Sequence, residues 1–194
     1  MFIHPTNPDV ADEAKTWTDG QTAAWGYLPN YAAAFASRPD IARAWTNLNL
    51  TVRNGMNRRR FEIATIAAAR ALRSTYCTAA HSTFLRDTCG DEQAMVALAT
   101  DLDRTTLDPT DRAVAAFARQ VVLDAAGITA DHTASLHAVG LDDNDIADIV
   151  FAVAARCFFA TTLDAMGVQA DAQLRTAFTP ELADQMVVGR PIAV

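Results

Sequence analysis

Apolar residues recur along this chain at spacings of three and four, which is the period of an amphipathic α-helix. After the polar start at residues 58–60, for example, Ile63, Ile66, Ala67 and Ala69 follow this spacing. The alternation of β-branched and polar residues that is typical of strands is almost absent. The pattern therefore predicts an all-α fold, built as a multi-helix bundle.

Turn and cap residues divide this pattern into separate helices. Pro39 and Asp40 supply a first turn, Asn54 and Gly55 end the same helix, and a glycine follows several others. No linker divides the chain, so residues 1–194 are expected to form one domain. The tail from residue 179 is predicted to be a helix fragment and an extended arm that packs on a neighbouring subunit. The predicted helices cover residues 10–17, 27–36, 39–53, 57–73, 76–88, 91–100, 110–125 and 143–166, with one more between Thr129 and Gly140.

Composition and charge narrow the class of protein. The formal net charge of −7 argues against nucleic-acid binding, which needs a basic face. The most apolar stretch, residues 146–163, is interrupted by Asp148 and Arg156 and therefore suits a buried bundle helix better than a membrane span. The N-terminus does not resemble a secretory signal, so we expect a cytoplasmic protein with no membrane contact. The three cysteines are too few for a disulfide scaffold and are expected to be thiols.

Three polar side chains share one stripe of the predicted helix that begins near residue 75. Ser74, Cys77 and His81 stand at positions i, i+3 and i+7. Unpaired N–H groups in the first helical turn favour a thiolate at Cys77, and His81 could accept or share its proton. Glu62, on the preceding helix, is a candidate proton acceptor if the two helices cross so that it meets this stripe.

The same four residues resemble the motif of the AhpD-like family, which includes alkylhydroperoxidases and carboxymuconolactone decarboxylases. That family carries a Glu, then eleven residues, then Cys-x-x-Cys-x-x-x-His, and Ser74 stands here in place of the first cysteine. The resemblance extends over about residues 20–175. It includes Tyr27-Leu28-Pro29-Asn30, Ser37-Arg38-Pro39, Leu107-Asp108-Pro109, Gly140-Leu141-Asp142-Asp143 and the segment at residues 159–167, and its downstream half is similar to the peroxidase-related branch of the family.

The resemblance implies an alkylhydroperoxidase-like oxidoreductase in which Cys77 attacks a hydroperoxide and becomes a sulfenic acid. Glu62 and His81 match the family's proton-relay residues, and no cofactor is implied. Ser74 cannot form the disulfide that normally resolves the sulfenate, and Cys89 lies twelve residues beyond Cys77, about 18 Å along a continuous helix. An external thiol is therefore expected to resolve Cys77. The resemblance also implies a homo-oligomer.

Other interpretations remain open at this point. His81 and Glu62 could serve a carboxymuconolactone decarboxylase-type lyase, or the chain could be a non-catalytic oligomeric scaffold that has lost the redox pair. Cys77, His81 and Glu62 could ligate a metal, although their spacing is poor for zinc. Cys157 reads as core filler and Ser74 as a simple N-cap. The arginines at residues 58–60 read as a solvated helix start, or as a site for an anion or an acidic partner.

Overall fold

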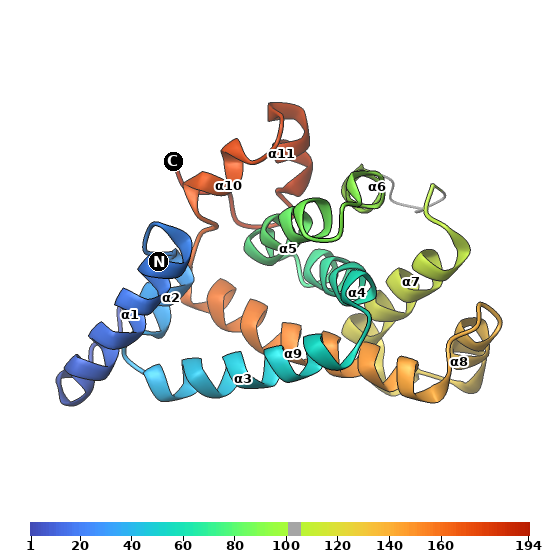
Figure 1. Ribbon diagram of the computed structural model, residues 1–194, viewed down its shortest axis with the longest axis horizontal. Coiled ribbons are helices and arrows are strands. Elements are labelled where there is room, and N and C mark those ends of the chain that lie inside the picture. Colours follow the sequence, from blue (N-terminus) through green and yellow to red (C-terminus); the bar gives the residue numbers. More distant parts are fainter. Residues whose placement is uncertain (101–105) are drawn as a thin grey trace.

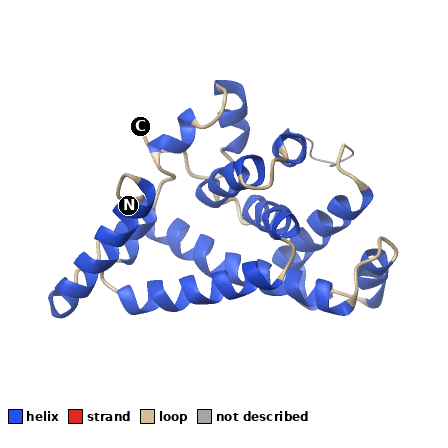
Figure 2. Cartoon of the chain, viewed as in Figure 1, coloured by secondary structure: helices blue, strands red, loops and turns tan. Residues whose placement is uncertain are grey.

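The structure, a computed structural model, describes residues 1–100 and 106–194 and confirms the all-α prediction. Within these residues it contains α-helices, two short 3-10 helices and no strand (Figures 1 and 2). The α-helices are α1 (Ala11–Trp25), α2 (Asn30–Phe35), α3 (Pro39–Gly55), α4 (Arg58–Ala71), α5 (Thr75–Asp87), α6 (Glu92–Thr100), α7 (Pro109–Asp124), α8 (Ala130–His137), α9 (Asp143–Met166), α10 (Ala172–Thr176) and α11 (Pro180–Met186).

Most helix boundaries fall within a few residues of the predicted ones, and two helices differ clearly. Helix α1 continues to Trp25, whereas the sequence predicted an end near residue 17. Gly20 does not interrupt it, because this glycine keeps a helical backbone and only Gly26 turns to a positive φ of 78°. Helix α10 was not predicted, since five residues are too few to show a helical period.

Helix α4 occupies the centre of the bundle (Figure 1) and packs against α5, α7 and α9. Its residues 61–69 are all buried, and four of them are alanines. Small side chains let neighbouring helices approach on every face of α4, which explains why it can be surrounded. The charged Glu62 in this stretch must therefore find its partners inside the protein.

The sequence suggested that the three arginines at the start of α4 are solvated. The structure instead gives each of them an acidic partner. The Arg58 side chain donates to Glu62, and Arg59 forms ion pairs with Asp91 and Asp111. Arg60 pairs with Asp145 at the start of α9. Arg59 and Arg60 thus tie α4 to α7, to α9 and to the start of α6, whereas Arg58 pairs within α4.

A tight turn at residues 72–74 leads from α4 into α5 and sets where the next helix begins. Arg73 adopts a positive φ of 59°, and the Ser74 N–H donates to the Ala69 carbonyl at 2.8 Å. The C-terminal arm crosses this turn, because the Gly189 N–H donates to Thr75 Oγ1 at 3.1 Å. A Cβ atom at residue 189 would lie 1.9 Å from the Arg73 carbonyl oxygen, so only glycine allows this approach.

The tail packs on its own chain, and its packing on a neighbouring subunit stays a prediction. Met186 and Ile192 are buried, and the Ala193 N–H donates to the Ala170 carbonyl. Among the described residues, α9 alone has the length and hydropathy of a membrane span. Half of its most apolar window is buried within the bundle.

The two-pronged contact between Arg59 and Asp111 should contribute to stability. The Arg59 Nη1 and Nη2 atoms lie 2.6 and 2.5 Å from the two carboxylate oxygens of Asp111, whose side chain is 7% exposed. We expect Asp111→Asn to lower the free energy of unfolding by about 2 kcal/mol, measured by urea denaturation, because it leaves a half-buried guanidinium partly unpaired.

The matched control is Asp40→Asn, since Asp40 pairs with Arg38 where both side chains are 56% exposed. An exposed pair contributes little, so this variant should unfold at the same urea concentration as the parent. Equal stability of the two variants would show that the Arg59 contact does not hold α4 to α7.

Candidate active site

A cavity of about 190 Å³ lies among α3, α4, α5 and α9, and it brings together three of the four residues singled out from the sequence. Cys77, His81 and Glu62 line it, and Ser74 does not. The lining reaches Trp25, which is 40% exposed, so the cavity extends toward the surface. The other lining residues are Tyr27, Tyr31, Trp45, Asn49, Arg53, Arg58, Phe61, Tyr76, Ala80, Phe84, Arg156, Phe159, Asp171 and Leu174.

Cys77 lies in the first turn of α5, where the sequence predicted it. It is 1% exposed, and its sulfur accepts a hydrogen bond from Arg156 Nη1 at 3.5 Å. N–H groups in a first helical turn have no partner within the helix and present the positive end of its dipole. The sulfur therefore faces a cation and a helix N-terminus, two features that stabilise a negative charge.

Glu62 and His81 form a buried dyad between α4 and α5. His81 Nδ1 lies 2.5 Å from Glu62 Oε2, and Arg58 Nε donates to Glu62 Oε1 at 2.6 Å. The Glu62 side chain is 0% exposed, and the ring of His81 lies edge-on to those of Phe61 and Phe84. Sequence spacing alone could not show how α4 and α5 cross. In the structure they cross so that the Glu62 carboxylate meets His81.

The environment of the dyad favours a neutral imidazole. Burial, and then the charge of Arg156, lower the pKa of His81 to about 4, against the opposing influence of Glu62. Burial would raise the pKa of Glu62, but the contacts with His81 and Arg58 outweigh it, and the net direction is down. A carboxylate at Oε2 fixes the proton of the neutral imidazole on Nδ1, which leaves Nε2 as the atom able to accept a proton.

Ser74 is fully buried at the N-cap position of α5, yet its hydroxyl does not cap the helix. It makes no hydrogen bond to the Cys77 sulfur or to Glu62, the two contacts that the sequence left open for it. The Ser74 hydroxyl acts on Asp164 of α9 instead. Burial raises the pKa of Asp164, and the Ser74 hydroxyl partly lowers it. The backbone of Ser74 is extended, with φ −91° and ψ 100°, immediately before the helix and three residues before Cys77.

Arg156 is the site residue that the sequence analysis missed. It is 2% exposed on α9, its Nη2 donates to Asn49 Oδ1 at 3.4 Å, and its guanidinium lies 5.5 Å from the centre of the Phe159 ring. Within residues 1–100 and 106–194 no carboxylate forms an ion pair with it, and its Nε has no hydrogen-bond partner. The sequence did contain a sign of this role, because Arg156 is the one arginine in the apolar stretch 146–163. A cation in a buried apolar helix is rare unless it has a partner or a function.

A second polar cluster closes the far side of the cavity. Asp171, at the start of α10, accepts hydrogen bonds from the hydroxyls of Tyr76 and Tyr27 and from the Asn30 N–H. Burial and the nearby carboxylate raise the pKa of Tyr27 to about 12 and raise that of Tyr76 as well. Both tyrosines therefore remain neutral donors. Asp171 has its hydrogen-bond partners in these groups and does not pair with the arginines of the cavity.

The remaining thiols lie outside this site. Cys89 and Cys157 are half-buried and do not line the cavity, and burial raises the pKa of both. Within residues 1–100 and 106–194, no group of three or more His, Cys, Asp or Glu side chains is placed to hold a metal ion. Cys77 is thus distinguished from the other two cysteines by its surroundings.

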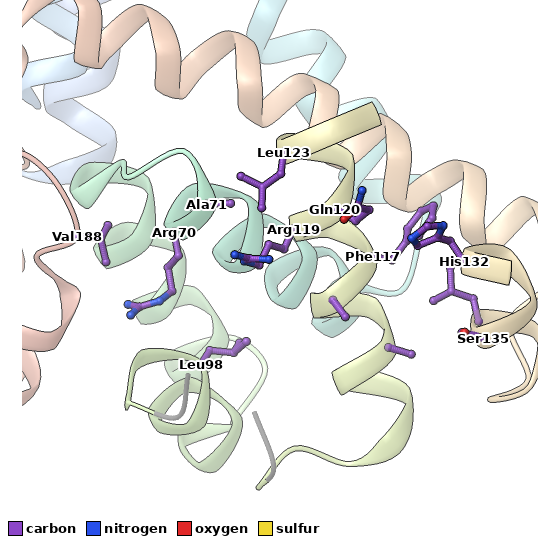
Figure 3. A pocket seen from close by; sticks show the side chains of 13 residues that line it. Arg70, Ala71, Leu98, Phe117, Arg119, Gln120, Leu123, His132, Ser135 and Val188 are labelled. Carbon is purple, nitrogen blue, oxygen red and sulfur yellow. The ribbon is translucent and has the colours of Figure 1, made fainter. Parts of the chain in front are cut away.

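A larger hollow of about 800 Å³ lies elsewhere, between α4, α6, α7 and α8 (Figure 3). Arg70 and Leu98 lie toward one end, His132 and Ser135 toward the other, and the side chain of Arg119 lies between them. None of the four residues predicted from the motif lines it. Size alone therefore does not mark the chemical site of this protein.

Comparison with solved structures identifies the architecture. The bundle superposes on the alkylhydroperoxidase AhpD core of a peroxidase-related protein from Ralstonia eutropha JMP134 with a TM-score of 0.77 at 20% identity, covering 89% of this chain and 93% of the other. The chain has the AhpD fold. No protein-family model matches the sequence, and no match is found among curated proteins.

Two further structures share the AhpD fold. A peroxidase-related protein from Silicibacter sp. TM1040 gives a TM-score of 0.76 at 21% identity, over 88% of this chain and 91% of the other. A cysteine-to-alanine variant of the debrominase Bmp8, in complex with tribromopyrrole, gives 0.74 at 19% identity, over 94% of this chain and 97% of the other. The AhpD fold thus carries more than one chemistry, and side chains must decide between them.

The buried dyad predicts a pH dependence of stability. As the pH falls from about 6.5 toward 4, the imidazole of His81 takes up a proton in the unfolded chain but not in the folded one, so unfolding becomes easier. The difference corresponds to a loss on the order of 3 kcal/mol over this interval. Urea denaturation at a series of pH values should show this loss for the parent protein.

His81→Asn should lack this part of the pH dependence, whatever its stability at neutral pH. The unfolding free energy of the parent should therefore fall relative to that of the variant as the pH falls. Parallel curves between pH 6.5 and 4 would mean that His81 is not held neutral inside the fold.

Proposed function

We propose that this protein is an AhpD-like oxidoreductase that reduces small organic hydroperoxides through a sulfenic acid at Cys77. The observation that carries the proposal is the single cavity shared by the Cys77 sulfur, the buried guanidinium of Arg156 and the Glu62–His81 dyad. A nucleophile needs a nearby base and a group that stabilises its charge, and both are present at this site. The AhpD fold of peroxidase-related proteins supports the same assignment.

In the proposed cycle the Nε2 atom of His81 accepts the thiol proton, and the thiolate attacks the terminal peroxide oxygen. A sulfur–oxygen bond forms while the O–O bond breaks, so the sulfur is oxidised by two electrons and the peroxide is reduced. The proton passes from His81 to the leaving oxygen, which departs as an alcohol. Glu62 acts as a positioning residue, because its bond to Nδ1 holds the imidazole in the required tautomer.

Resolution of the sulfenic acid requires a thiol from outside the chain. Ser74 supplies no sulfur, and neither Cys89 nor Cys157 lines the cavity. One external thiol would condense with the sulfenic acid to a mixed disulfide and water, and a second would release Cys77 while forming the external disulfide. The proposed reductant is therefore a small thiol, or a dithiol carrier, able to enter past Trp25.

A second candidate is thiol-dependent removal of bromide from a small aromatic ring. The aromatic lining of the cavity and the likeness to a debrominase over 94% of this chain favour it. Release of bromide from tribromopyrrole in the presence of excess thiol would support this activity, provided that Cys77→Ser abolishes it.

Two interpretations from other classes also stay testable. A carboxymuconolactone decarboxylase-type lyase would use His81 and Glu62 and keep its lactone turnover in Cys77→Ser. A non-catalytic scaffold would show none of these activities.

We also propose a homo-oligomer. Phe151 and Phe158 offer exposed apolar side chains one heptad apart on α9. Light scattering of the protein as it elutes from a sizing column tests this proposal.

The peroxidase proposal predicts oxidation at one defined sulfur. Millimolar organic hydroperoxide followed by dimedone should add a single label at Cys77, located by mass spectrometry of peptides. Thiol-dependent turnover should fall to the uncatalysed rate in Cys77→Ser and stay within about twofold of the parent in Cys89→Ser and Cys157→Ser, which lie outside the cavity. An unlabelled Cys77 under these conditions would refute the proposal.

The position of Ser74 predicts that a resolving cysteine can be restored. In Ser74→Cys the new sulfur stands three residues before Cys77 on the same helix face, so oxidation by one equivalent of hydroperoxide should give an intramolecular disulfide. The matched control is Ser82→Cys, a buried serine five residues beyond Cys77 that faces a different direction. Non-reducing peptide mapping should find the disulfide in the first variant only, and its absence there would contradict the proposed geometry.

A further inference from the structure

The wall of the cavity is unusually rich in aromatic side chains. All three tyrosines of the chain and two of its three tryptophans line this one space, together with three phenylalanines. Aromatic edges and faces attract another flat ring more strongly than a saturated group of the same size. The wall therefore favours a ligand that contains an aromatic ring.

The size of the cavity suits a ligand with one ring. Its volume is about 190 Å³, and an apolar cavity of about 150 Å³ is known to hold benzene. The cavity therefore has room for one ring that carries a small polar substituent.

Arg156 shows where that substituent belongs. A guanidinium carries five N–H donors, and the two acceptors within reach here are the Cys77 sulfur and the Asn49 amide oxygen, at 3.5 and 3.4 Å. The Nε donor has no partner, although the side chain is 2% exposed. A buried donor without an acceptor is unfavourable unless a ligand or water supplies one. A ligand oxygen bound to Arg156 would lie beside the reacting sulfur.

We infer that the cavity selects a hydroperoxide carried on a single aromatic ring, with the ring against the aromatic wall and the peroxide oxygens accepting hydrogen bonds from Arg156. The hydroperoxide group rests on the proposed function, whereas the ring and its oxygen substituent rest on the cavity alone. When the O–O bond breaks, negative charge develops on the leaving oxygen, and the guanidinium donors stabilise it until it is protonated to the alcohol.

Binding can be measured without turnover by using the alcohol product. In Cys77→Ser, cumyl alcohol should quench the tryptophan fluorescence saturably, because Trp25 and Trp45 line the cavity. It should bind at least fivefold more tightly than its cyclohexyl analogue, in which the ring is saturated but the size is similar. Equal affinity for the two alcohols would overturn the inference.

Arginine variants test the polar half of the site. Arg156→Met in the Cys77→Ser background should weaken the binding of cumyl alcohol at least fivefold. Arg119→Met, an exposed arginine in the other hollow (Figure 3), should leave it unchanged. Should the methionine variant fail to fold, Arg156→Lys retains the charge but loses the planar fork and should still weaken binding. Unchanged affinity in a folded Arg156 variant would contradict the assignment.

Rates of Cys77 oxidation separate this inference from the proposed function. Cumene hydroperoxide should oxidise Cys77 at least tenfold faster than tert-butyl hydroperoxide. If the protein binds the aromatic alcohol selectively but no hydroperoxide oxidises Cys77, the peroxidase proposal is wrong and the inferred ring selectivity is supported. If all hydroperoxides oxidise Cys77 at equal rates and binding shows no preference for the aromatic ring, the peroxidase proposal is supported and the ring selectivity is wrong.

Discussion

The hydrogen bond between Glu62 and His81 joins helices α4 and α5 at a place where the Glu62 side chain is fully buried and that of His81 is 9% exposed. A buried carboxylate is strongly unfavourable unless charge and hydrogen bonds compensate it. Arg58 supplies the charge and the imidazole supplies a donor, so α4 and α5 must keep the crossing that brings these three groups together. The same crossing places the first turn of α5, with Cys77, at the floor of the cavity.

Much of this arrangement could be predicted from the sequence, because helical period and cap residues depend on local chemistry. The stripe that contains Cys77 and His81 follows directly from their spacing on one helix. The pairing of Glu62 with His81 does not, since it depends on how two helices cross. The arginine triplet was read as solvated for a similar reason: the acidic partners of Arg59 and Arg60 lie 32 to 85 residues away along the chain.

Arg156 shows the limit of motif-based reasoning most clearly. It lies 79 residues from Cys77 and belongs to no motif that the sequence analysis recognised. Its meaning comes from three structural facts: its burial, its contact with the sulfur, and a buried Nε atom without a hydrogen-bond partner. The solved AhpD folds, at 19 to 21% identity, establish the architecture alone. The chemistry proposed for this chain therefore depends on its own side chains around one sulfur.

The most direct test of this account is a crystal structure of the protein determined after brief exposure to an organic hydroperoxide. The account predicts a single added oxygen on the Cys77 sulfur, within hydrogen-bond distance of Arg156, while Cys89 and Cys157 remain thiols. Density for an unmodified Cys77 next to an oxidised Cys89 or Cys157 would contradict it.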